Sequence, residues 1–99
     1  MTIKLINRNI EAELLLQGRL DSLAAPEVEQ VFTQVAERFD TVIINMAQMD
    51  YISSLGLRAL KLLYMKMTKK GGTLALKNVN KMVMEVFEMT GFAGLLRFI

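Results

Sequence analysis

The opening part of the chain alternates between apolar and polar residues. Every second residue from Ile10 to Leu16 is apolar, and glutamates occupy positions 11 and 13. This period of two is typical of a β-strand with one buried face, and Gly18 is expected to end the strand. An apolar segment at residues 3–6 and the asparagine-containing turn at residues 7–9 predict an antiparallel hairpin at the start of the chain.

The hydrophobic period becomes helical after Pro26. Apolar residues then recur every three or four positions, which places them on one face of an α-helix. Proline is favoured at the first helical position, and acidic residues suit the positive end of the helix dipole. We therefore predict a helix whose core residues are Val28, Val31, Phe32, Val35 and Phe39.

A continuous apolar run, Val42-Ile43-Ile44, follows this helix. A β-branched run without alternation is typical of a strand covered on both faces, and it predicts the central strand. Residues 45–54 are expected to form a loop that leads into a second helix near Leu55. Gly71-Gly72 is expected to end that helix, because glycine is preferred just beyond a helix C-terminus.

A third unit repeats the order of strand and helix. Residues 73–76 predict a strand, Asn80 can cap a helix that runs to about Met89, and Gly91 closes that helix, whereas residues 92–99 receive no assignment. Alternating strands and helices with short connections predict parallel strands. We therefore predict one α/β domain over residues 1–99, with a mixed sheet.

The composition restricts the possible chemistry. The 99 residues include no cysteine and no histidine, which excludes disulfides, thiolate nucleophiles, histidine bases and most transition-metal sites. Without a convincing cluster of reacting groups, we expect no cofactor and no enzymatic activity. No apolar run approaches the roughly 20 residues that span a bilayer, and no secretory signal is recognised, so a cytoplasmic protein without membrane insertion is expected.

Charge is distributed unevenly along the chain. The formal net charge of +2 is too weak to argue for direct nucleic-acid binding. The first 50 residues carry four basic and eight acidic side chains, whereas the rest carry eight basic and two acidic ones. The two halves either attract each other within the domain or present a basic face to an acidic partner.

Ser53 and Ser54 lie where the second helix is predicted to begin. A hydroxyl at this position faces unpaired backbone N–H groups and the positive end of the helix dipole. One interpretation is a structural N-cap that contributes about 1 kcal/mol. The other is a phosphorylation site, because a phosphate adds roughly −1.5 to −2 charges at a position that accommodates anions.

Two aspartates and the second helix raise further alternatives. Asp21 and Asp50 are either paired acids or ordinary turn and capping residues. When the second helix is projected at 100° per residue, three apolar side chains fall among its basic residues, which include Arg58. These three are either covered by neighbouring helices or form a docking patch. They are Leu55, Leu62 and Met65.

The segment Tyr51–Arg58, with sequence YISSLGLR, resembles the signature of the STAS family, in which Asp-Ser-Ser-Gly-Leu or Ser-Ser-Ala-Gly-Leu-Arg opens the second helix. Four further landmarks occur in the same order along the chain and resemble the family's segments. They are Gly18-Arg19-Leu20-Asp21, Val42-Ile43-Ile44, Gly71-Gly72-Thr73-Leu74 and Met89-Thr90-Gly91-Phe92.

The resemblance implies a β-α superhelix of about four to five strands, with helices mainly on one side of the sheet. It also implies an anti-sigma factor antagonist that acts by partner switching. In that scheme the protein binds an anti-sigma factor serine kinase, which phosphorylates it, and a serine phosphatase reverses the modification. Alignment on Gly56 places the phosphoacceptor at Ser54, with Ser53 as second choice. The partner-binding residues implied or proposed are Asp21, Ser53, Leu55, Gly56, Arg58, Leu62 and Met65.

The sequence departs from the family pattern at two positions. Ser53 and Asn45 each stand where many members have aspartate. These departures would allow phosphorylation to be lost or moved to Ser53. Together with the basic second helix, they motivate an alternative function, in which the chain is an accessory STAS subunit that binds a transporter ATPase or another signalling assembly without being phosphorylated.

Overall fold

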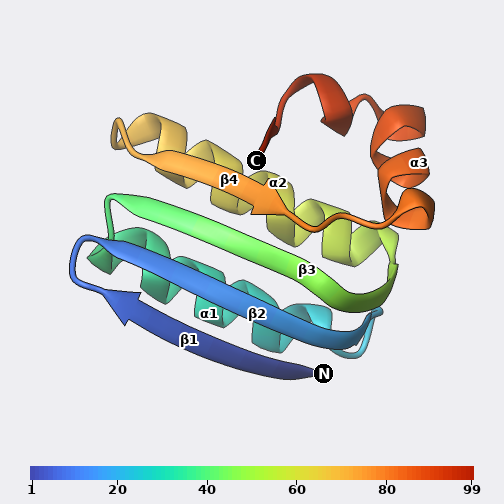
Figure 1. The fold of residues 1–99 in the computed structure, drawn as a ribbon, viewed down its shortest axis with the longest axis horizontal. Helices are drawn as coiled ribbons and strands as arrows, with labels where there is room; N and C mark the ends of the chain where they lie inside the picture. The colour runs from blue at the N-terminus through green and yellow to red at the C-terminus, as the bar shows by residue number, and fades with distance from the viewer.

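The computed structural model describes all 99 residues and forms a five-stranded sheet flanked by helices. The strands lie side by side in chain order (Figure 1). β1 pairs with β2 in antiparallel orientation, and the other neighbouring strands pair in parallel. The mixed sheet is thus confirmed. Its strands are β1 (Thr2–Arg8), β2 (Glu11–Leu20), β3 (Thr41–Ile52), β4 (Thr73–Lys77) and β5 (Arg97–Phe98).

Three helices complete the fold. Helix α1 (Ala25–Arg38) and helix α2 (Ser54–Lys69) lie side by side behind the sheet, and α3 (Lys81–Thr90) lies at one end of it, beyond the arrowhead of β4 (Figure 1). A short 3₁₀ helix, η1 (Phe92–Gly94), connects α3 to β5. None of these helices combines the length and the hydropathy needed to cross a membrane. The opposite face of the sheet, called the open face below, carries no helix.

The core lies between the sheet and α1 and α2. Ala12, Leu14 and Leu16 of β2 point into it, as their alternation predicts. The predicted apolar face of α1 is confirmed, because four of its five residues are buried and Val31 is half-buried. Ile10 departs from the pattern, since it lies in the β1–β2 turn and is 61% exposed.

The prediction that the central strand is covered on both faces is wrong. Val42 and Ile44 are fully buried against the helices, whereas Ile43 points to the open face and is only half-buried. β3 is nevertheless the middle strand of the sheet, as the apolar run predicts.

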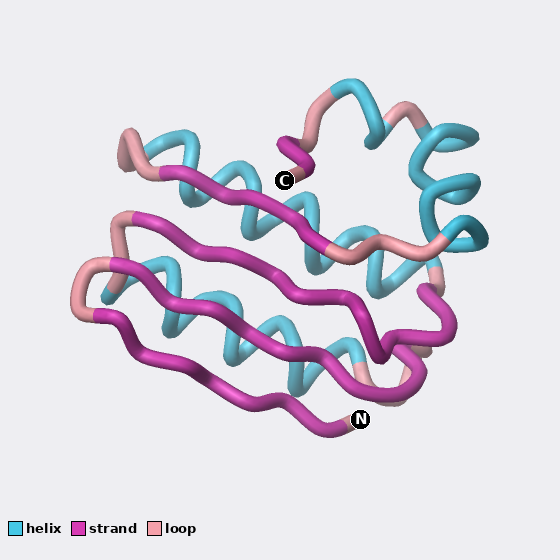
Figure 2. Tube along the Cα trace, viewed as in Figure 1, coloured by secondary structure: helices cyan, strands magenta, loops and turns pink.

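Two predicted strand ends are also wrong. β2 continues through Gly18 to Leu20, and β3 continues from Asn45 to Ile52, where a loop was expected. The pairing of β2 with β3 shifts register twice, between Leu15 and Gln17 and again after Gly18. Each irregularity inserts an extra residue in β3, which breaks the period of two that identifies a strand. The trace of β3 bends accordingly near its end (Figure 2).

The C-terminal predictions are largely confirmed. Asn80 caps α3 by accepting a hydrogen bond from the Val83 N–H at 2.8 Å, and Gly91 ends the helix in the left-handed region at φ 82°. The segment without an assignment forms η1 and then β5, which pairs with β4 through only two residue pairs.

Candidate functional site

The two serines at the start of α2 occupy different environments. Ser53 is the N-cap: its Oγ accepts a hydrogen bond from the Gly56 N–H at 3.1 Å, and only 7% of the residue is exposed. The Ser53 N–H donates to the Leu20 carbonyl at 2.8 Å, which ties the helix start to the end of β2. Ser54 is the first residue of α2 and is exposed. Of the two hydroxyls, that of Ser54 is therefore the one open to a partner.

Gly56 allows α2 to approach the sheet closely. A Cβ atom on this residue would lie 2.7 Å from Leu20 Cγ and 3.0 Å from both the Leu20 carbonyl and Ile52 Cγ1. These distances are shorter than van der Waals contact, so a larger residue would displace the first turn of α2. Gly56 is thus buried, and its small size determines where the start of α2 places Ser53 and Ser54.

Asp21 shapes the turn between β2 and α1. Its Oδ1 accepts hydrogen bonds from the backbone N–H groups of Leu23 and Ala24, at 3.1 and 2.9 Å. This is the behaviour of a turn aspartate. Asp50 lies exposed on β3, no hydrogen bond joins it to Asp21, and no three acidic residues converge anywhere in the chain. The structure therefore does not support paired acids.

The outer surface of α2 exposes apolar side chains among its cations. Leu55 is 42% exposed and Met65 is 53% exposed, so neighbouring helices do not cover them. Leu62 is half-buried beside α1, and Arg58 is exposed. A shallow recess of about 470 Å³ runs along this surface; its lining residues include Leu62, Met65 and Lys69.

Sequence reasoning missed three exposed residues near the helix entrance. The guanidinium of Arg19 lies 4.3 Å from the centre of the Tyr51 ring, a cation–π contact between the ends of β2 and β3. Leu23, in the turn shaped by Asp21, is 92% exposed. The positions of Arg19 and Tyr51 within two of the family-like segments were the available signal, but their contact depends on the β2–β3 register.

A cluster of polar side chains surrounds Glu13 on the open face of the sheet. The alternation at positions 10–16 leaves Glu13 on the solvent side, yet the residue is only 3% exposed. Arg8 and Lys77 form ion pairs with its carboxylate at 2.9 and 3.1 Å, and Asn45 Nδ2 donates to it at 3.0 Å. Burial alone would raise the pKa of Glu13, but the hydrogen bonds from Asn45, Lys77 and Arg8 outweigh it, so the pKa lies below its ordinary value.

This cluster gives a physical reason for one departure from the STAS pattern. Asn45 donates its amide to Glu13, while its Oδ1 accepts hydrogen bonds from the Ala47 N–H and from Asn78 Nδ2. Aspartate at position 45 has no donor when ionised and would place a second negative charge beside Glu13. Asparagine at position 45 therefore complements the Glu13 carboxylate, and it affects Ser53 and Ser54 only indirectly.

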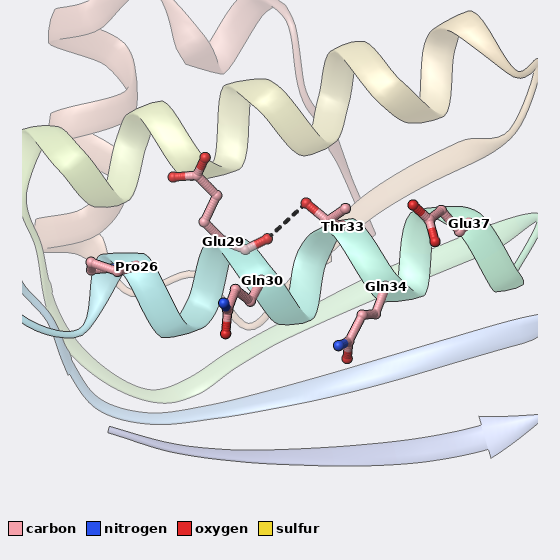
Figure 3. A pocket seen from close by; sticks show the side chains of 6 residues that line it. All are labelled: Pro26, Glu29, Gln30, Thr33, Gln34 and Glu37. Carbon is pink, nitrogen blue, oxygen red and sulfur yellow. Dashed lines mark hydrogen bonds between the residues drawn. The ribbon is translucent and has the colours of Figure 1, made fainter.

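The largest recess lies elsewhere, on the outer surface of α1. It measures about 570 Å³ and contains none of the predicted site residues (Figure 3). Its lining is polar apart from Pro26, and the Thr33 hydroxyl donates to the Glu29 carbonyl within the helix. Glu29 and Glu37 are its only ionisable groups, so it brings together no nucleophile, base and orienting group.

Fold and site together define a small α/β domain that exposes a serine at a helix start, beside apolar and basic side chains of the same helix. The chain belongs to the STAS-domain family, whose sequence model matches residues 5–99.

Two curated relatives are similar over most of this chain. BtrV of Bordetella bronchiseptica, a proposed anti-sigma factor antagonist, is 33% identical over 96 residues, which cover 94% of this chain and 83% of the relative. The anti-sigma-B factor antagonist of Bacillus subtilis is 23% identical over 86 residues, which cover 87% of this chain and 79% of that protein.

Solved structures share the fold at low sequence identity. A proposed anti-sigma factor antagonist from Thermotoga maritima superposes with a TM-score of 0.90 at 14% identity, covering 97% of this chain and 84% of the other. The anti-sigma factor antagonist SpoIIAA, in its unphosphorylated form, gives 0.80 at 16% identity, covering 99% and 87%. A sulfate transporter family protein from Wolinella succinogenes gives 0.79 at 21% identity, covering 96% and 80%.

Proposed function

We propose that this chain is a cytoplasmic anti-sigma factor antagonist whose partner is selected by phosphorylation of Ser54. In its unmodified form it binds an anti-sigma factor serine kinase. The kinase transfers a phosphate to the Ser54 hydroxyl, and a serine phosphatase removes it. The protein itself acts by binding, without catalysis or a cofactor.

The observation that carries this proposal is the exposed hydroxyl of Ser54 at the first residue of α2. A phosphate there meets the positive end of the helix dipole and leaves the core untouched. Ser53 is the weaker candidate because its hydroxyl is buried and already accepts the Gly56 N–H. Similarity to curated anti-sigma factor antagonists supports the class of partner.

The proposed partner surface surrounds Ser54. Leu55, Arg58, Leu62 and Met65 contribute side chains from α2. The other members, Asp21, Ser53 and Gly56, contribute by shaping the β2–α1 turn and the start of α2.

Phosphorylation by the cognate kinase tests this function directly. With the purified kinase and ATP, intact-mass spectrometry should show one added phosphate on the wild-type chain and none on Ser54→Ala. Ser54→Ala should still bind the kinase, because the hydroxyl contributes little contact area. Ser53→Ala is the matched control: it should accept one phosphate while losing about 1 kcal/mol of stability with its cap.

An unmodified wild-type chain in complex with its kinase would contradict the proposal. The accessory alternative receives support at the level of fold alone, from the sulfate transporter family protein. Recovery of a transporter ATPase in native pull-downs, unaffected by Ser54→Ala, would replace partner switching with that function.

A further inference from the structure

Helix α2 carries a one-sided distribution of charge. Its 16 residues contain no aspartate or glutamate. Three of its cations project from the exposed face, and none of them forms an ion pair within the chain, because the cation of every salt bridge is Arg8 or Lys77. The three cations are Arg58, Lys61 and Lys69.

These cations alternate with apolar side chains along one line of the helix. Arg58, Leu62, Met65 and Lys69 follow the spacing i, i+4, i+7 and i+11, which keeps them on one face. We call these four residues, with Lys61, the α2 stripe. The stripe ends at Lys69, which lies roughly 22 Å along the helix axis from Ser54. Its distal residues are therefore well separated from the phosphorylation site.

Charge complementarity restricts what can cover this stripe. Unpaired cations around an apolar strip fit a surface that combines carboxylates with apolar side chains. An extended anionic bilayer fits less well, because the neighbouring helix α1 exposes Glu27, Glu29 and Glu37 and would be repelled. A localised acidic surface on a protein can contact α2 without contacting α1.

We propose that the α2 stripe docks onto an acidic, partly apolar protein surface, and that its distal half supplies affinity independently of the Ser54 hydroxyl. This inference rests on the proposed function, and the partner that covers the α2 stripe is the anti-sigma factor serine kinase. A phosphate on Ser54 would bring roughly −1.5 to −2 charges beside Arg58, one turn away, and offset the positive charge at that end of the stripe, while Lys69 lies beyond the screening distance. Phosphorylation then weakens docking by reducing the electrostatic attraction, as well as by changing the contact at Ser54.

Binding of the kinase that phosphorylates Ser54 tests the inference, measured by calorimetry at low and high ionic strength. Lys61→Glu and Lys69→Glu should each weaken binding by roughly five- to tenfold at low salt and reduce its salt dependence, because attraction becomes repulsion. Met65→Ala should weaken binding about tenfold at both salt concentrations, through lost apolar contact. Lys4→Glu on β1 is the matched control with the same change in net charge, and it should bind like the wild type.

The outcomes separate this inference from the proposed function. If Ser54 is phosphorylated but Lys61→Glu and Lys69→Glu bind as the Lys4→Glu control does, the acidic docking surface is wrong and the switch stands. If no kinase binds or phosphorylates the chain, both fall. Sedimentation of the chain with phosphatidylserine vesicles, abolished by Lys69→Glu, would replace the protein partner with a lipid surface. Unchanged melting temperatures of the variants verify that they fold.

Discussion

At the scale of single residues, Glu13 shows how burial and charge are reconciled. Its side chain is 5% exposed, and its carboxylate is paired with cations from β1 and β4 and with an amide from β3. A buried charge of this kind is tolerated only when its hydrogen bonds are satisfied. The cluster thus links four strands across the open face and favours the observed register.

The depressed pKa of Glu13 gives the protein a defined acid sensitivity. Because the folded-state pKa lies below the unfolded value, the stabilisation from Glu13 is present above the ordinary glutamate pKa and is lost as pH falls through the folded-state value. Glu13→Gln should therefore flatten the dependence of unfolding free energy on pH in the acidic range. Urea denaturation at a series of pH values measures this. Glu85→Gln, at an exposed position of α3, should keep the wild-type slope, and equal slopes for all three proteins would contradict the assignment.

At the scale of elements, the site depends on how closely the first turn of α2 approaches the sheet. Hydrogen bonds from the Ser53 N–H to the Leu20 carbonyl and from the Gly56 N–H to Ser53 Oγ hold the turn in place. The missing side chain at Gly56 supplies the space. The exposure of Ser54 is thus a consequence of helix placement.

Gly56→Ala should disturb that placement. The added methyl group would overlap Leu20 and Ile52, and overpacking of this kind costs about 1–3 kcal/mol. We expect lower stability by chemical denaturation together with slower phosphorylation of Ser54. Gly94→Ala is the matched control, because a Cβ at that position meets nothing within 4 Å. Wild-type stability in Gly56→Ala would show that the close approach is unimportant.

At the scale of the whole molecule, the sheet is held unequally along its width. β3 pairs with β2 and β4 on its two sides, and the helices cover its inner face. β5 contributes only two residues at the edge, and the ring centre of Phe98 lies 6.1 Å from that of Phe87. Local opening is therefore expected to begin at the C-terminal edge.

Amide hydrogen exchange measures this gradient. The slowest exchange should occur in the middle of β2 and β3, at positions such as Leu14 and Ile44, where both flanks are paired. Residues 97–99 should exchange faster by orders of magnitude, because opening them leaves the core intact. Equal protection at Ile44 and Ile99 would instead indicate that the molecule opens only as a single unit.

The sequence by itself determined the order of the main elements, the core faces of β2 and α1, and the position of the serines at a helix start. These features are local, because hydrophobic periods and caps involve residues only a few positions apart. The tertiary structure alone decided which serine is exposed, how far β3 extends, and that Glu13 is buried. Glu13 bonds Asn45 and Lys77, 32 and 64 positions away, and only the register of four strands brings them together.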